Sequence, residues 1–455
     1  MELFFNIIYF IIAIGVLVAI HELGHFLAAR WTGMRAEVFS IGMGKRLFGW
    51  NKINGLTFGN LDESIELGNH TDYRLAAFPI GGYVKISGMI DESFDTNFTA
   101  SEPQEWEFRA KNSLQKAFVL SAGVIMNFLL AIVVFACISF INGSSELSTT
   151  EIYKVETQSL AAKAGFQSGD IVKKINNTDI NSWNSFIEQL TLKELGNELN
   201  IEVLRNNKIE VLTVNGASII KGIAKKENLG LLPGGIKTVV DEVVKGNPAD
   251  KAGIQAGDTI IQCNDIPISS VNALQTTLKD YKGKEIVLSW NRNGKIMTHT
   301  LTTTESGLIG VRLSYAPLKL IEYGFFESIG IGFKETIGAT ELLIKSISQI
   351  FKGNLSFKES VAGPLMIMDM AGEQANRGLI SFLSFIALLS ISLAFMNILP
   401  FPALDGGHLV FVLIEGIIRK ELPVKVKLAF QQGGIVILLL FMAFVFYNDI
   451  VRMLK

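Results

Sequence analysis

Long apolar stretches alternate with polar ones along the chain, and four of the apolar stretches are long enough to suggest membrane spans. They cover residues 3–29, 118–141, 379–404 and about 428–447. A helix of roughly 20 apolar residues crosses the hydrocarbon core of a bilayer. The pattern therefore predicts four membrane-spanning helices, and the 49% share of apolar residues in the 455-residue chain also favours a membrane protein.

Basic residues cluster beside three of these stretches: Arg30 and Arg35 after the first, Arg109, Lys111 and Lys116 before the second, and Arg419, Lys420, Lys425 and Lys427 before the last. Short loops rich in Lys and Arg stay on the cytoplasmic side of a membrane. We therefore expect these segments to be cytoplasmic, with the N-terminus and the region between residues 142 and 379 outside. The short loop at 419–427 carries most weight in this assignment.

The region between residues 142 and 379 is mostly polar and contains an internal repeat. AAKAGFQSGDIV at 161–172 recurs as ADKAGIQAGDTI at 249–260. The copies share two glycines and an aspartate: Gly165, Gly169 and Asp170 in the first, and Gly253, Gly257 and Asp258 in the second. Each copy continues with a β-branched strand, a helical segment and late strands. The repeat predicts two copies of one small α/β domain.

Two other segments have a mixed character. Residues 323–352 place apolar residues on a helical period that charges interrupt, which is typical of an amphipathic helix, or two, on a membrane surface. Residues 78–89 alternate like a strand after a Gly81-Gly82 turn and are apolar for a soluble loop. Such a strand can dip into the bilayer edge only where protein or water covers its backbone.

Polar residues close the first apolar stretch in the sequence HELGH. His21 and His25 are four residues apart, so they project from one face of a helix, and Glu22 follows the first histidine. This is the HExxH pattern of zinc peptidases, with two metal ligands and a general base. Since HELGH replaces a small-residue cleavage site and no basic residue precedes the stretch, we expect it to be retained rather than removed as a signal peptide.

The expected depth of HELGH in the membrane indicates whether its polar side chains need a bound ion. At about 1.5 Å per residue from Leu3, His21 lies roughly 27 Å along the helix, near the cytoplasmic face of the hydrocarbon. Imidazoles and carboxylates there cost several kcal/mol unless they are paired or bind an ion. The alternative is that the chain leaves the membrane at Ile20 and these side chains reach the headgroups.

A catalytic zinc site needs a third protein ligand, and Asp405 is the one carboxylate at the close of the third apolar stretch. Pro400 and Pro402 interrupt a helix there, and the glycines that follow, Gly406 and Gly407, predict a tight turn. An Asp-Gly turn in water is the alternative for this motif. His408 is a rival for the ligand position.

Several motifs together carry a family resemblance. They are HELGH, GGYVK at 81–85, a small-residue motif with Asn127 in the second stretch, the two repeats, and NILPFPALDGG at 397–407. The chain resembles the site-2 protease family of intramembrane zinc metalloproteases over nearly its whole length, and its repeats resemble PDZ domains. One departure is Val124, where the family often has proline, which puts the local helix geometry in doubt.

The resemblance implies a site and an activity. It implies one Zn2+ per chain bound by His21, His25 and Asp405, with Glu22 as the base. It implies substrate contacts at Asn397 and, by strand pairing, at Gly81, Gly82, Tyr83 and Val84. The implied reaction is regulated intramembrane proteolysis of single-span proteins, such as anti-sigma factors or signal-peptide remnants, in a bacterial inner membrane. The PDZ domains are expected to bind extended peptide termini and to gate access.

The expected fold is a polytopic α-helical membrane protein with four transmembrane helices and two extracytoplasmic α/β PDZ domains. Its parts are a first transmembrane helix over 1–30, a cytoplasmic loop over 31–116, a second transmembrane helix over 117–142, PDZ domains over 148–222 and 228–305, an amphipathic segment over 323–352, and transmembrane helices over 379–407 and 428–448.

Two other classes of function compete with the protease. A membrane-anchored PDZ scaffold with a non-catalytic metal has no use for Glu22. An ion or proton carrier uses intramembrane His, Glu and Asp, but the spans show no inverted repeat. The net charge of −2 gives no support to a nucleic-acid partner, and Cys137 and Cys263 imply no disulfide framework.

Overall fold

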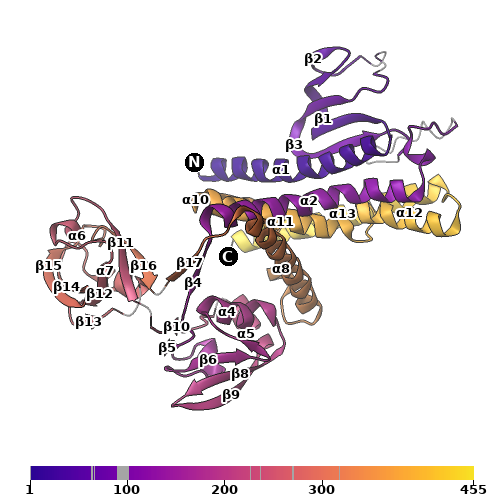
Figure 1. Cartoon of the computed structure of the whole chain (residues 1–455). Coiled ribbons are helices and arrows are strands. Elements are labelled where there is room, and N and C mark those ends of the chain that lie inside the picture. Colours follow the sequence, from indigo (N-terminus) through magenta and orange to yellow (C-terminus); the bar gives the residue numbers. More distant parts are fainter. Residues whose placement is uncertain are drawn as a thin grey trace. The chain divides into compact units, whose positions relative to one another are not determined.

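The computed structural model of the protein describes residues 2–62, 65, 67–89, 102–225, 227–235, 237–268, 271–316 and 318–454. The chain forms two compact units. Unit 1 contains Met1–Asn142, Tyr323–Ile344 and Ser356–Lys455, and unit 2 contains Gly143–Glu322 and Lys345–Leu355. Figure 1 shows the helices of unit 1 and the small sheets of unit 2, which we describe separately.

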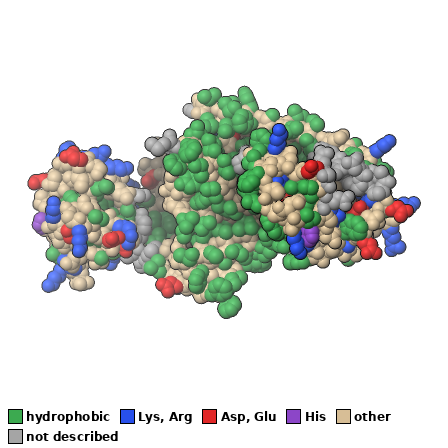
Figure 2. All heavy atoms as spheres, turned by 90° about the horizontal axis from the view of Figure 1, so that it is seen from above, with side chains coloured by type: hydrophobic (Ala, Val, Ile, Leu, Met, Phe, Trp, Pro, Cys, Tyr) green, Lys and Arg blue, Asp and Glu red, His purple; other side chains and the backbone are tan. Residues whose placement is uncertain are grey.

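Four helices of unit 1 are long and apolar enough to cross a membrane: α1 (Glu2–Trp31), α2 (Ser113–Asn142), α11 (Leu379–Ile398) and α13 (Val424–Met453). They cover the four apolar stretches, so the prediction of four membrane-length helices is confirmed. Many large hydrophobic side chains on these helices are exposed, and Figure 2 shows hydrophobic side chains gathered over the middle of one face of the molecule, as expected where helices meet lipid.

The helix in the third apolar stretch ends before the apolar stretch itself does. Helix α11 stops at Ile398, and Leu399 is already extended, with φ −62° and ψ 142°. The cause is Pro400, which disfavours helical backbone in the residue before it. The chain then turns and starts a new helix, α12 (Asp405–Ile418). The prediction of a tight turn at Gly406 and Gly407 is wrong, because both lie in the first turn of α12.

The remaining helices of unit 1 are shorter or divided between the units. Helix α10 (Pro364–Asn376), which the apolar pattern did not predict, contacts both α1 and α11. Short turns cover Phe108–Ala110 (η2) and Phe357–Ser360 (α9). The segment with interrupted helical periodicity forms one helix, α8 (Phe325–Phe351). Its place on a membrane surface stays a prediction.

A small sheet with the order β2-β1-β3 follows α1. Its strands are β1 (Ala36–Asn51), β2 (Gly55–Phe58) and β3 (Asp72–Ile86). Both Gly81 and Gly82 lie inside β3, so the expected turn before a strand is wrong. Because Gly81 has φ +84°, which favours glycine, the strand can change direction there. Residues 39–41 accordingly pair with two parts of β3, residues 73–75 and 82–84.

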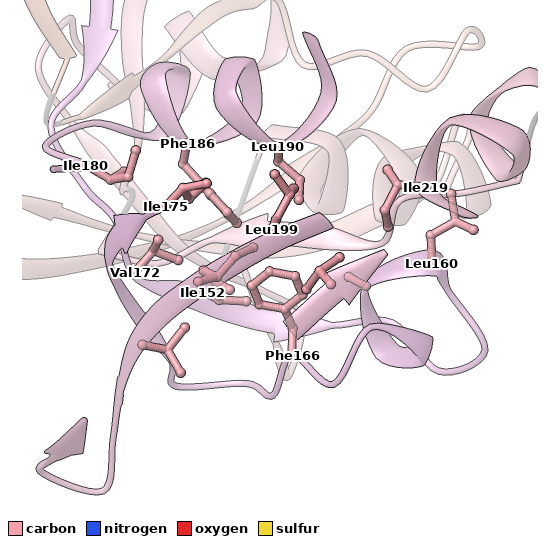
Figure 3. Packing of buried hydrophobic residues seen from close by; sticks show 14 of the residues in the cluster. Ile152, Leu160, Phe166, Val172, Ile175, Ile180, Phe186, Leu190, Leu199 and Ile219 are labelled. Carbon is pink, nitrogen blue, oxygen red and sulfur yellow. The ribbon is translucent and has the colours of Figure 1, made fainter. Parts of the chain in front are cut away.

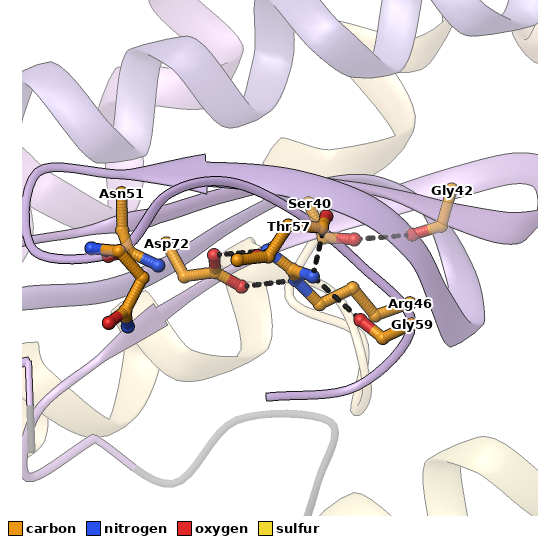
Figure 4. Close-up of polar contacts among 8 residues, drawn as sticks. Ser40, Gly42, Arg46, Asn51, Thr57, Gly59 and Asp72 are labelled. Atoms are coloured by element: carbon orange, nitrogen blue, oxygen red, sulfur yellow. Dashed lines mark hydrogen bonds and ion pairs between the residues drawn. The ribbon is translucent and has the colours of Figure 1, made fainter. Parts of the chain in front are cut away.

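A buried ion pair holds the three strands together (Figure 4). Arg46 on β1 is 4% exposed and Asp72 on β3 is 1% exposed. Two guanidinium nitrogens of Arg46 donate to the two carboxylate oxygens of Asp72, at 3.0 and 3.1 Å. A further nitrogen donates to the carbonyl of Gly59 at 2.6 Å, just after β2. This bidentate geometry, with the other donors also satisfied, offsets the cost of burying the charges.

Unit 2 contains the two repeats, each with its own sheet and core. The first repeat has the sheet β7-β6-β8-β9 and the second has β15-β14-β12-β11-β16. The elements of the first part are β4 (Ser144–Leu147), β5 (Ile152–Val155), α3 (Leu160–Lys163), β6 (Ile171–Ile175), β7 (Thr178–Asp179), α4 (Trp183–Glu188), η3 (Gln189–Lys193), β8 (Glu198–Arg205), β9 (Lys208–Asn215), α5 (Gly216–Ala224) and β10 (Leu231–Pro233).

The second part has the elements β11 (Lys237–Val243), α6 (Pro248–Lys251), β12 (Thr259–Cys263), β13 (Ile266–Pro267), α7 (Val271–Asp280), β14 (Glu285–Arg292), β15 (Lys295–Thr302), β16 (Val311–Ala316) and β17 (Leu318–Ile321). Each repeat encloses a separate apolar core. Phe166 and Phe186 stack edge to face in the first core, which Figure 3 shows.

The repeated GD motif has the same physical role in both copies. Asp170 is fully buried, and its two oxygens accept from Arg205 at 2.7 and 2.8 Å. In the second copy, Asp258 accepts from Arg292 at 2.7 Å on each oxygen. Each arginine also donates to a carbonyl of the repeated glycine pair, at Gly165 or Gly253. The motif thus ties the turn after the first helix to a strand more than 30 residues later.

We expect Asp170→Ala to destabilise the first repeat by about 3 kcal/mol, because it removes two charge-assisted hydrogen bonds from Arg205, which keeps its contacts with Glu210 and Gly165. Hydrogen–deuterium exchange of β6 and β8 in the full-length protein in detergent measures this. The control is Asp179→Ala, whose ion pair with Lys174 is exposed and 3.6 Å long. The control should cost less than about 1 kcal/mol. Equal exchange in the two variants would contradict the role of Asp170.

Candidate metal centre

Helix α1 presents two buried histidines on the face that packs on α2. His21 is 7% exposed and His25 is 8% exposed. Their ring centroids are 4.8 Å apart, since residues four apart lie one above the other on a helix. The Nδ1 atom of His25 is 2.8 Å from the backbone carbonyl of Val119 on α2. A donor at Nδ1 leaves Nε2 of His25 as the atom that can bind a metal.

Asp405 meets both histidines, although it lies 384 residues beyond His21. Its Oδ2 atom is 3.0 Å from His21 Nε2 and 3.3 Å from His25 Nε2. The two Nε2 atoms are 3.2 Å apart. Ligands 2.0–2.1 Å from a tetrahedral zinc ion are separated by about 3.3 Å. The three atoms therefore form a triangle of the size that a zinc site requires.

The backbone before Asp405 explains how the carboxylate arrives there. The loop between α11 and α12 contains Ala403 at φ +72°, and α12 starts at Asp405. A Cβ on Gly406 would lie 2.2 Å from the carbonyl oxygen of Leu399, and one on Gly407 would lie 2.3 Å from that of Phe401. The glycines are thus needed so that the start of α12 can pack directly on the loop. Asp405 rather than His408 joins the histidines in the metal-binding group.

Glu22 lies beside this group and outside it. The backbone of Val84 on β3 forms a hydrogen bond with the Glu22 carboxylate. A Cβ on Gly82 would be 3.4 Å from Cγ of Glu22 and 3.0 Å from Cγ1 of Val18. The second half of β3, at the edge of its sheet, therefore runs along α1 at the position of the expected base.

The other residues expected at the site are close to it. The Nδ2 atom of Asn397, near the end of α11, is 3.4 Å from His21 Nε2. Gly81, Gly82, Tyr83 and Val84 lie in β3. The structure thus brings Asn397 to His21 and the strand to Glu22.

The sequence analysis did not identify contacts from α2. The Nδ2 atom of Asn127 is 3.2 Å from Nδ1 of His21, and Gly123 lies against both histidine rings. A spacing of four residues connects Val119, Gly123 and Asn127. This spacing is the one signal that could have assigned one face of α2 to the site.

A cavity of about 230 Å³ lies next to this region in unit 1. His408 and Leu120 are part of its lining. Basic residues from two predicted cytoplasmic segments also line it, namely Arg109 and Lys116 before or at the start of α2, and Lys427 at the start of α13. Its polar groups make it suitable for water.

Comparisons with known proteins agree with this geometry. The model of peptidase family M50 matches residues 9–441. The chain is 32% identical to the regulator of sigma E protease of Haemophilus influenzae, over 98% of each chain. It is 30% identical to protease RseP of Yersinia pestis over the full length of both. A protein of Neisseria meningitidis that is named as a zinc metalloprotease is 32% identical over 98% of each chain.

The family match covers far more than half of the chain, and it includes HELGH, the repeats and Asp405. The resemblance to the site-2 proteases is therefore confirmed. The chain belongs to peptidase family M50 and is a membrane zinc metalloendopeptidase of the site-2 type.

Proposed function

We propose that the protein cleaves single-span membrane proteins inside or near the bilayer, with one Zn2+ per chain bound by His21, His25 and Asp405. The observation that carries this proposal is the triangle of Nε2, Nε2 and Oδ2 atoms, with sides of 3.0, 3.2 and 3.3 Å, which forms between the membrane-length helix α1 and the start of α12. Three protein ligands leave a fourth position open, as a catalytic zinc requires.

Glu22 is the general base of this proposal. It lies next to His21 in the sequence but contributes no atom to the metal-binding group. When bound in such a site, zinc lowers the pKa of a water molecule towards 7 and polarises a carbonyl. The Glu22 carboxylate then accepts the proton of the attacking water and donates it to the leaving amine.

The substrate must unwind before it is cut, because a helical peptide bond is shielded by its own hydrogen bonds and side chains. Unwinding frees backbone groups that are costly in lipid. The edge strand at Gly81, Gly82, Tyr83 and Val84 can pair with the unwound segment, and its proximity to Glu22 supports that role. Asn397 can contact the same segment, since it is within 3.4 Å of His21.

The orientation in the membrane is part of the proposal. The N-terminus and unit 2 lie outside the cytoplasm, and the site lies near the cytoplasmic face of a bacterial inner membrane. The cavity supports this, because basic residues from two separate segments that were both assigned to the cytoplasm line it together. The physiological substrates are anti-sigma-factor-like proteins or signal-peptide remnants. The name of the Haemophilus influenzae relative, regulator of sigma E protease, favours the former.

The two repeats, predicted over 148–222 and 228–305, act as PDZ domains that bind extended peptide termini and restrict access to the site. The separate core and complete sheet of each copy support an independent binding role.

The variant Glu22→Gln should bind zinc as the wild type does but lose cleavage of a co-expressed single-span substrate, because it keeps the ligands and removes the base. Immunoblots of the substrate and zinc analysis of the purified protein are the measurements. Glu335→Gln, an exposed change in α8, is the control. Cleavage by Glu22→Gln at the normal rate would favour the scaffold with a non-catalytic metal.

Substitution of Asp405 by Asn should reduce zinc affinity by more than about tenfold, since even residues that only support ligands contribute that much. The zinc-to-protein ratio after purification measures the effect. Asp280→Asn in α7 is an exposed control. An unchanged ratio of one zinc per chain would remove Asp405 from the ligand set.

Deletion of residues 148–305 should leave the chemistry intact and change substrate choice. We expect a substrate that has already lost its extracytoplasmic part to be cleaved at the rate of the full-length enzyme. An intact substrate should then be cleaved as well, because the restriction on access is gone. If the deletion variant cleaves neither substrate although it binds zinc, a gating role is wrong.

A further inference from the structure

One face of α2 forms a support for both candidate histidine ligands. Val119, Gly123 and Asn127 are four residues apart, so they lie in a row about 12 Å long. The carbonyl of Val119 is 2.8 Å from Nδ1 of His25. A Cβ on Gly123 would lie only 2.5 Å from His25 Nε2 and 2.7 Å from His21 Nε2. The bare glycine therefore allows both rings to rest against this helix.

Asn127 completes the row at the other histidine. Its side chain is fully buried, and its amide nitrogen is 3.2 Å from Nδ1 of His21. Its amide oxygen has no hydrogen-bond partner among the residues that the structure describes. The hydroxyl of Ser390 on α11 donates to the backbone carbonyl of Asn127, at 2.8 Å.

The geometry of His21 determines what it needs from this amide. Its Nε2 atom faces Asp405 and His25, so Nε2 is the atom directed at the metal. A neutral imidazole that binds a metal through Nε2 carries its proton on Nδ1 and must donate from there. A rotation of the Asn127 amide by 180° places the oxygen, rather than the nitrogen, 3.2 Å from this donor. One rotation thus provides an acceptor for His21 and a partner for the buried oxygen.

We propose that Asn127 is a positioning residue that accepts the Nδ1 proton of His21 and holds the ring in the tautomer that binds the metal. This inference rests on the proposed zinc site. His25 is oriented in the same way by the carbonyl of Val119, but a backbone acceptor cannot be removed by substitution. Of the two acceptors, only the side chain of Asn127 can therefore be tested by substitution.

The test is the affinity of the purified full-length protein for zinc, measured in detergent by competition with a chromophoric chelator. Support from such partners is typically worth 10–100-fold in metal affinity. We expect Asn127→Leu and Asn127→Ala to bind zinc about 10- to 100-fold more weakly than the wild type. Asn127→Asp retains an acceptor and should bind at least as tightly as the wild type. Asn142→Leu, an exposed change at the end of the same helix, is the matched control.

Two results would overturn the inference. In the first, Asn127→Leu or Asn127→Ala binds zinc within about threefold of the wild type, well short of the expected loss. In the second, Asn127→Asp loses as much affinity as Asn127→Leu, so that packing and not the acceptor matters. Failure of the zinc site itself is distinguishable, because then the wild type would not bind zinc stoichiometrically. If Asn127→Leu does not fold, the pair of Ala and Asp variants decides the question.

Discussion

The close approach of α1 and α2 is the constraint on which the catalytic region depends. A Cβ on Gly24 would lie 2.3 Å from the carbonyl oxygen of Ala122, and a Cβ on Gly123 would overlap the two imidazoles. Small residues let membrane helices approach until their backbones touch, and packing then provides the association energy that lipid does not. At this distance α2 can support the rings of His21 and His25 directly.

The third ligand reaches the same point through a break in a helix. Pro400 ends α11 near the metal-binding group, and α12 restarts the chain with Asp405 in its first turn. Two glycines keep that first turn against the loop before it. Irregular backbone at membrane depth is tolerated where protein buries it. The break thus lets a carboxylate follow directly on an apolar helix and reach the two histidines.

Buried ion pairs organise the parts of the chain that lie outside these helices. Arg46 and Asp72 join the strands of the sheet whose edge runs beside Glu22. The pairs Asp170 with Arg205 and Asp258 with Arg292 perform the same task in the two repeats. In the small sheet the bidentate contact joins two strands, and in each repeat it fixes a turn relative to a strand, so these pairs determine geometry as well as stability.

Local patterns in the chain were sufficient for much of this description. The length of the apolar stretches identified the four membrane helices, and the spacing of His21 and His25 placed them on one helical face. Both depend only on residues near each other in the sequence. The repeated GD motif could likewise be read directly, although its arginine partners could not.

Other features were not predicted. The early end of α11, the helical state of Gly406 and Gly407, and the course of β3 differed from expectation, although Pro400 and Gly81 explain two of them locally. The sequence analysis did not recognise the four-residue spacing in α2 that supports the histidines. Hydropathy and motif spacing describe one segment at a time, whereas the metal-binding group and its support arise where residues 94 and 384 positions apart come into contact. Only the packing of α1, α2 and α12 decides which groups share that small space.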